Sequence, residues 1–75
     1  MPVRLYTTVG CHLCEQARDW VSMVDPGLAL TLVDVAEDDA LLARYGERIP
    51  VLCMDGCELA WPFGLLEVQR FLLNT

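Results

Sequence analysis

The chain has 75 residues, of which 55% are hydrophobic, and its formal net charge is −6 at pH 7. We expect a single domain over residues 1–75, because this length is near the lower limit at which one core can hold a fold. The acidic balance argues against a nucleic-acid partner, since such surfaces cluster Lys and Arg against phosphates. Neither a secretion signal nor an apolar run of about 20 residues is visible, which predicts an unexported, cytoplasmic protein without a membrane partner.

The first part of the chain predicts a strand followed by a helix. Residues 3–7 form a short apolar run, and a helical pattern starts a few residues later. The apolar positions with helical spacing are Leu13, Ala17, Trp20, Val21 and Val24. They predict one buried stripe, and the residues Asp25-Pro26-Gly27 should end the helix.

A second strand and a second helix follow. Residues 28–35 are rich in apolar and branched side chains, and their length suits a buried strand. Residues 38–45 predict a helix that ends at Gly46. Its inward-facing residues are expected to be Leu41, Leu42 and Tyr45.

The last third of the chain predicts a hairpin and a closing helix. Residues 51–54 and 57–60 flank Asp55-Gly56, which is the strongest short signal for a two-residue turn between antiparallel strands. The final amphipathic helix is marked by Leu65, Leu66, Val68, Phe71 and Leu72. The element order βαβαββα therefore predicts an α/β protein with a four-stranded mixed sheet flanked by three helices.

Two cysteines stand where the first helix should begin, in the motif Cys11-His12-Leu13-Cys14. With Cys11 as the N-cap, its sulfur lies near the unpaired amides of Leu13 and Cys14 and near the positive helix end. Cysteines in such settings have pKa values of roughly 3.5 to 7.5, against about 8.5 for a free side chain. Cys11 is therefore the predicted nucleophile, and Cys14, one turn later, is placed to attack a mixed disulfide formed at Cys11.

With this motif the chain resembles the glutaredoxin branch of the thioredoxin fold, and it is most similar to the short glutaredoxin-like proteins of bacteria. The resemblance rests on residues 5–8 before the dithiol, on Ile49-Pro50-Val51-Leu52, and on Gly56 before a final helix. It implies a thioredoxin-like (glutaredoxin-like) fold and a thiol–disulfide oxidoreductase in which Cys11 attacks and Cys14 resolves. It also implies that the Ile49–Pro50 peptide is cis, faces the dithiol, and exposes the Ile49 backbone to a bound substrate chain.

Departures from the glutaredoxin pattern bear on the substrate and the reductant. The Thr-Val-Pro of glutathione-binding members is Arg48-Ile49-Pro50 here, and Trp61-Pro62-Phe63-Gly64 replaces a Gly-Gly pair. Arg48 is a candidate contact for an anionic ligand, and His12 is expected to tune the dithiol at the edge of the substrate site. The sequence leaves open whether glutathione is the reductant. The expected partner is a disulfide-bearing or glutathionylated protein or a small thiol, with no bound cofactor and a monomeric chain.

The remaining cysteines, Cys53 and Cys57, raise the question of a metal site. In the predicted hairpin Met54 pairs with Cys57 and Cys53 with Glu58, so the two sulfurs point to opposite faces of the sheet. They can then neither share a metal nor form a disulfide easily. Two alternative functions stay open: a metal module, whose dithiol binds zinc or a bridged iron–sulfur cluster, and a thioredoxin-fold module that binds a partner without turnover.

Overall fold

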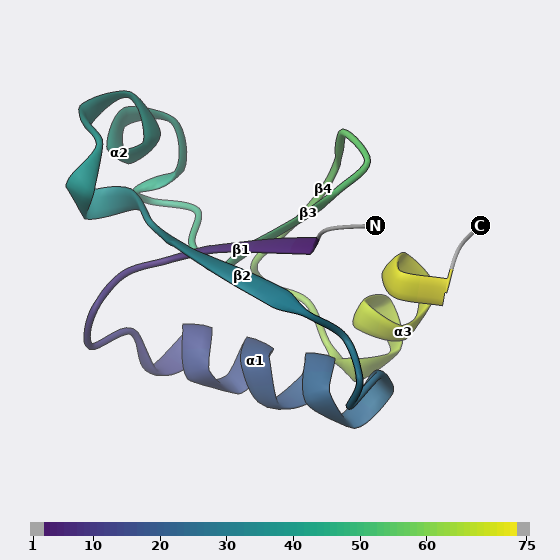
Figure 1. Ribbon diagram of the computed structural model, residues 1–75. Coiled ribbons are helices and arrows are strands. Elements are labelled where there is room, and N and C mark those ends of the chain that lie inside the picture. The colour runs from purple at the N-terminus through teal and green to yellow at the C-terminus, as the bar shows by residue number, and fades with distance from the viewer. Residues whose placement is uncertain (1–2, 74–75) are drawn as a thin grey trace.

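The computed structural model describes residues 3–73, and its elements follow the predicted order (Figure 1). They are β1 (Val3–Thr7), α1 (His12–Val24), β2 (Leu30–Asp34), the short 3-10 helix η1 (Val35–Glu37), α2 (Asp39–Tyr45), β3 (Val51–Met54), β4 (Cys57–Ala60) and α3 (Leu65–Leu73). The predicted βαβαββα order is confirmed. Only η1 was not foreseen, and it begins where the Asp34 carboxylate accepts a hydrogen bond from the Ala36 amide.

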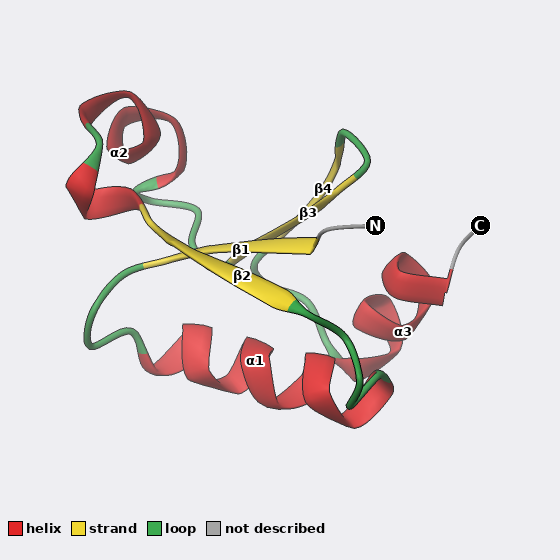
Figure 2. Cartoon of the chain, in the orientation of Figure 1, coloured by secondary structure: helices red, strands yellow, loops and turns green. Residues whose placement is uncertain are grey.

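The four strands, drawn in yellow in Figure 2, form one mixed sheet, and their order is β2-β1-β3-β4. β1 runs parallel to β2 and antiparallel to β3, and β3 and β4 form the hairpin. In this register Tyr6 near the end of β1 lies opposite Val51 at the start of β3, and Val51 lies opposite Ala60 at the end of β4. The end of β1, the start of β3 and the end of β4 therefore lie together at the end of the sheet where the loop to α1 begins.

Helices cover both faces of the sheet, as predicted. α1 and α3 lie together on one face, and α2 lies on the other (Figure 1). The first face buries Val3, Leu5, Ala17, Val21, Leu52, Phe63 and Val68. The second face buries a smaller group, which consists of Tyr6, Val35, Tyr45 and Val51. Neighbouring residues of one strand enter different groups because strand side chains alternate between faces.

The buried stripe of α1 differs from the predicted one at its first residue. Cys14, Ala17 and Val21 are buried, and Trp20 and Val24 pack partly against the same core. Leu13 is 46% exposed, so the prediction that it belongs to the stripe is wrong. Each helical residue is rotated by about 100° from the previous one, so a helix that turns Cys14 toward the sheet turns Leu13 away from it.

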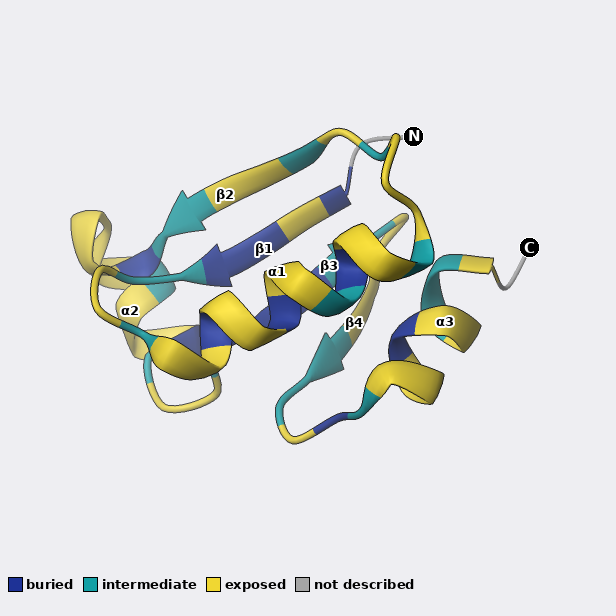
Figure 3. Ribbon diagram, turned by 90° about the horizontal axis from the view of Figure 1, so that it is seen from below, coloured by how far each residue is buried: buried dark blue, intermediate teal, exposed yellow. Residues whose placement is uncertain are grey.

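The second strand is shorter and more exposed than predicted. β2 covers Leu30–Asp34 rather than residues 28–35, and Leu32 is 44% exposed. Figure 3 shows β2 exposed or half-buried beside β1, which is mostly buried. The difference follows from the strand order, because β2 is an outer strand with a neighbour on one side only.

The shorter helix α2 also buries less than predicted. Tyr45 is buried and Leu41 packs against the same group, but Leu42 is 47% exposed. Residues four apart lie on one side of a helix, so Leu41 and Tyr45 can face the sheet together while Leu42 cannot. The inward orientation predicted for Leu42 is wrong. In α3, Val68 is buried whereas Leu65 and Leu66 are exposed.

The hairpin has the predicted turn and register. Asp55 and Gly56 both have positive φ angles, 53° and 79°, as a turn between twisted antiparallel strands requires. Met54 pairs with Cys57, and Cys53 pairs with Glu58. Cys53 packs beside the second buried group, whereas Cys57 is exposed. Within residues 3–73, no helix is long and apolar enough to cross a membrane.

Candidate active site

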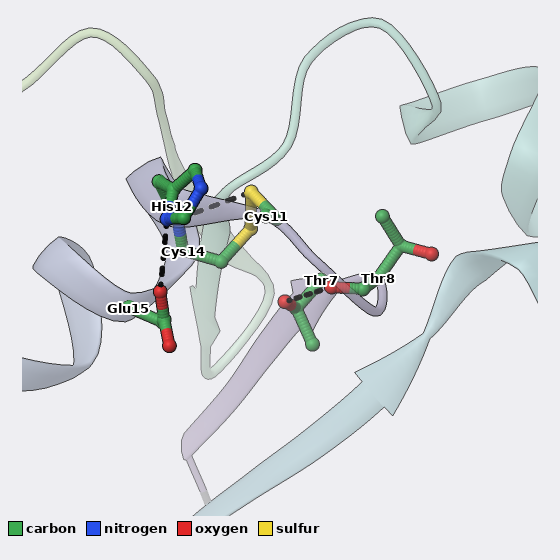
Figure 4. Close-up of polar contacts among 6 residues, drawn as sticks. All are labelled: Thr7, Thr8, Cys11, His12, Cys14 and Glu15. Atoms are coloured by element: carbon green, nitrogen blue, oxygen red, sulfur yellow. Dashed lines mark hydrogen bonds and ion pairs between the residues drawn. A yellow bond between two sulfur atoms is a disulfide. The ribbon is translucent and has the colours of Figure 1, made fainter.

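Cys11 lies at the end of the loop after β1 and is the N-cap of α1, as predicted. Its backbone is extended, and its Sγ accepts a hydrogen bond from the Cys14 amide at 3.1 Å (Figure 4). Gly10 supplies the reversal from strand to helix, because its φ of 79° is easily reached only by glycine. The sulfur of Cys11 is joined to that of Cys14 in a disulfide, so the structure represents the oxidised state of the pair.

The two sulfurs of this pair are unequally accessible. Cys14 is 2% exposed and belongs to the buried stripe of α1. Cys11 is half-buried and stands at the mouth of the helix. A substrate sulfur can therefore reach Cys11 more readily than Cys14. The amides and the dipole at the helix N-terminus favour a negative charge on the same sulfur.

The side chain of His12 contacts Glu15. The side chain of His12 is 94% exposed, and its Nδ1 lies 3.3 Å from Oε2 of Glu15, which is 70% exposed (Figure 4). Exposed pairs of this kind contribute at most about 1 kcal/mol, because water screens them. His12 thus forms an exposed edge of the site beside Cys11, without a bond to either cysteine.

Pro50 lies at the same end of the sheet as the dithiol. The pairing of Tyr6 with Val51 puts Pro50, one residue before Val51, beside the end of β1. The Ile49–Pro50 peptide bond is cis, and Pro50 is buried. Its carbonyl accepts a hydrogen bond from the Trp61 amide at 3.0 Å.

The backbone of Ile49 is only partly available to a substrate chain. Its amide donates to the Tyr45 carbonyl at 3.1 Å, and the Arg48 amide donates to the same carbonyl at 2.7 Å. The resemblance to glutaredoxins implies that the Ile49 backbone contacts the substrate. Because the Ile49 amide is already bonded within the chain, only its carbonyl oxygen is left for that contact. The end of α2 fixes this segment through the two bonds to Tyr45.

Arg48 belongs to a group of side chains around Glu58, which we call the Glu58 cluster and which consists of Arg44, Tyr45, Arg48 and Glu58. Its Nη2 lies 3.6 Å from Oε1 of Glu58, and its guanidinium carbon lies 5.7 Å from the centre of the Tyr45 ring. Arg44 approaches the same carboxylate at 3.9 Å, and the Tyr45 hydroxyl donates a hydrogen bond to it. The bond to Glu58, together with burial, raises the pKa of Tyr45 to about 12. The role of Glu58 was missed from sequence, although the predicted pairing with Cys53 put these two side chains on one face of the hairpin.

An aromatic group holds the loop after β4 against α1. The rings of Trp20 and Trp61 are stacked with centres 5.8 Å apart, and Phe63 meets Trp61 edge-on at 5.1 Å. The Trp61–Pro62 peptide bond is also cis. Trp61 and Phe63 come from the segment that, by the resemblance to glutathione-binding glutaredoxins, replaces a Gly-Gly pair. Phe63 is buried in the core group of the first face, and Trp20 and Trp61 pack against that group.

β1, which leads to Cys11, has β3 with Pro50 on one side and β2 on the other. A hollow of about 320 Å³ borders the disulfide on the side of β2, and we call it the β2-side hollow. It is lined by Thr7, Thr8, Val9, Gly10, Cys11, Cys14, Glu15, Arg18, Leu32 and Asp34. Two larger surface hollows, of about 640 and 750 Å³, include neither Cys11 nor Cys14 in their linings. Of these three hollows, the β2-side hollow is the one that borders the dithiol.

The described residues do not gather a metal site within one chain. In residues 3–73, no group of three or more His, Cys, Asp or Glu side chains is arranged to hold a metal ion. Cys53 and Cys57 are on neighbouring strands but on opposite faces, as the hairpin register predicted. A zinc site built from the four thiols of one chain thus has no geometric support in this part of the molecule.

The strand order, the helices on both faces and the cysteine pair at the start of α1 define a glutaredoxin-like protein of the thioredoxin fold. This arrangement fits a redox role. The family model described as Glutaredoxin-like domain (DUF836) matches residues 2–73, and the chain belongs to this family. No curated protein matches the chain at a significant level.

Solved structures agree with this assignment. The X-ray structure of the structural genomics target XcR50 from X. campestris is 35% identical, with 97% of each chain covered and a TM-score of 0.88. Its solution structure is 37% identical, covers 100% of this chain and 96% of that one, and has a TM-score of 0.87. A mutant of the thioredoxin-like protein BC3987 is 21% identical, with 93% and 97% covered and a TM-score of 0.70, and it supports the fold alone.

Proposed function

We propose that this protein is a thiol–disulfide oxidoreductase in which Cys11 is the nucleophile and Cys14 the resolving residue. The observation that carries the proposal is the hydrogen bond from the Cys14 amide to Cys11 Sγ at 3.1 Å, at the first turn of a 13-residue helix. The amide and the helix dipole stabilise a negative sulfur, and the thiolate is the form that attacks disulfides. The unequal exposure of the two cysteines supports the same assignment of roles.

The reaction consists of two exchanges that pass two electrons to the substrate. The Cys11 thiolate attacks a substrate disulfide, forms a mixed disulfide with one sulfur, and releases the other as a thiolate that takes a proton from water. Cys14 then gives its proton to water and attacks Cys11. The disulfide seen here forms, and the first substrate sulfur leaves as a thiolate. Two thiols of a reductant, which become a disulfide, return the pair to the dithiol.

Substrate contacts in this proposal come from the β3 side and from the exposed edge of the site. Pro50 and the Ile49 carbonyl would border an extended substrate chain, and His12 would lie at its rim. Arg48 would contact an anionic ligand only by leaving Glu58, which lies 3.6 Å away. The substrate class is a disulfide-bearing or glutathionylated protein, and glutathione or another thiol would serve as reductant.

The proposal is tested by trapping the mixed disulfide. The Cys14→Ser variant, reduced and then mixed with a cystine-containing peptide, should accumulate a peptide adduct at Cys11 that mass spectrometry detects and a reducing agent removes. Cys57→Ser is the matched control, since it removes an exposed thiol at the hairpin and should turn over like the wild type. Wild-type turnover by Cys11→Ser, or no adduct in Cys14→Ser, would overturn the proposal.

A further inference from the structure

The hollow on the β2 side of the dithiol combines exposed apolar side chains with carboxylates. Val9 is 90% exposed and Leu32 is 44% exposed, and both line the hollow. Glu15 and Asp34 line it too, with Arg18 as its single guanidinium. An apolar surface beside a reactive disulfide gains free energy when a bound molecule covers it. The hollow therefore favours a ligand that is both apolar and charged.

The two carboxylates of the hollow make different local contacts. Asp34 accepts a hydrogen bond from the Ala36 amide at 2.9 Å, so its side chain is fixed at the end of β2. Glu15 is one turn from Cys11 and lies 3.3 Å from the His12 imidazole. Two carboxylates and one guanidinium leave the lining acidic, in a chain whose net charge is −6. This charge attracts cations to the hollow and repels anions.

We propose that the β2-side hollow binds a lysine or arginine side chain that flanks the disulfide of a polypeptide substrate. Such a side chain has an apolar stem, which would lie on Val9 and Leu32, and a cationic end, which would face Asp34 and Glu15. The hollow, at about 320 Å³, has room for one such side chain. This inference rests on the proposed oxidoreductase function and specifies its substrate.

The test compares three peptides of equal length, each linked through its cysteine to a coloured leaving thiol. They differ only beside the cysteine, where they carry Lys, Gln or Glu. With reduced wild-type protein at low salt, the second-order rate constant for release of the coloured thiol should fall in the order Lys, Gln, Glu, with a ratio of about fivefold or more between Lys and Glu. The ratio should shrink at high salt because salt screens exposed charges.

Asp34→Asn and Asp55→Asn form a matched pair that separates the hollow from the charge of the whole chain. Both remove one negative charge. Asn can still cap η1 at position 34 and still fits the turn at position 55, which lies at the far end of the sheet. Asp34→Asn should lower the preference for the Lys peptide at least twofold, and Glu15→Gln should do the same. Asp55→Asn should leave the preference unchanged.

The outcomes distinguish this inference from the function on which it rests. If reduced wild-type protein releases the leaving thiol from none of the peptides, the oxidoreductase function itself fails. If it reacts with all three at one rate, or if Asp55→Asn lowers the preference as much as Asp34→Asn does, the function stands and the lysine or arginine site is refuted.

Discussion

The two sides of the dithiol are built from different kinds of contact. On the β3 side, Pro50 is buried, its carbonyl is bonded to Trp61, and the Glu58 cluster anchors the segment before it. On the β2 side, Leu32 is exposed and lines an open hollow. The β3 side therefore holds the geometry of the site, and the β2 side is free to vary its contacts with a substrate. Changes on the β3 side should lower stability, and changes on the β2 side should alter selectivity.

The largest expected difference comes from the same substitution on an inner and an outer strand. Leu52→Ala on β3 removes a fully buried side chain, so the free energy of unfolding should fall by about 2–5 kcal/mol. Leu32→Ala on β2 should cost less than about 1 kcal/mol, because that side chain is already 44% exposed. Urea denaturation of both variants measures the two values. Equal losses would show that β2 is as firmly packed as β3.

Removing a glutamate on the β3 side should also lower the free energy of unfolding more than removing one on the β2 side, but the difference should be smaller than for the two leucines. Glu58→Ala leaves the partly buried hydroxyl of Tyr45 without its acceptor and Arg48 without its partner, so the free energy of unfolding should fall by about 1–3 kcal/mol. Glu15→Ala removes an exposed contact with His12 and should change stability by at most about 0.5 kcal/mol. Thermal unfolding at neutral pH checks both. A larger loss for Glu15→Ala would reverse the comparison.

The contribution of Tyr45 on the β3 side to stability should depend on pH in the alkaline range. Tyr45 binds its proton more tightly in the folded chain, because its pKa is raised from 10.0 to about 12, first by the bond to Glu58 and then by burial. Its contribution is fully present below pH 10 and is lost as the pH rises toward 12. Tyr45→Phe should lack this loss. Tyrosinate absorbance, read against unfolding curves, measures it, and loss of the contribution below pH 10 would contradict the assignment.

Local signals in the sequence were sufficient for the order of the four strands and three α-helices and for the position of the dithiol. The Asp55-Gly56 turn set the hairpin register, and the strand-to-helix junction located Cys11 as the N-cap. The exposure of Leu13 and Leu32 depends instead on how α1 is rotated and on which strand lies at the edge. No local pattern determines either.

The Glu58 cluster near the site also could not be predicted from local sequence patterns. Tyr45 was predicted to face inward and Glu58 was placed on β4, but their contact depends on where α2 sits over the hairpin. The cis bond between Trp61 and Pro62 likewise arises within a packed aromatic group that only the tertiary structure assembles. Contacts between distant segments are thus what the sequence did not reveal.

The most direct test of the central claim is the pH dependence of Cys11 alkylation in the reduced protein. A thiolate stabilised by the Cys14 amide and the helix dipole should react with iodoacetamide along a titration curve whose pKa lies below the value of about 8.5 for a free cysteine. Peptide mapping by mass spectrometry assigns the reaction to Cys11. A curve with a pKa at or above 8.5 would show that the helix terminus does not activate Cys11, and the oxidoreductase assignment would lose its physical basis.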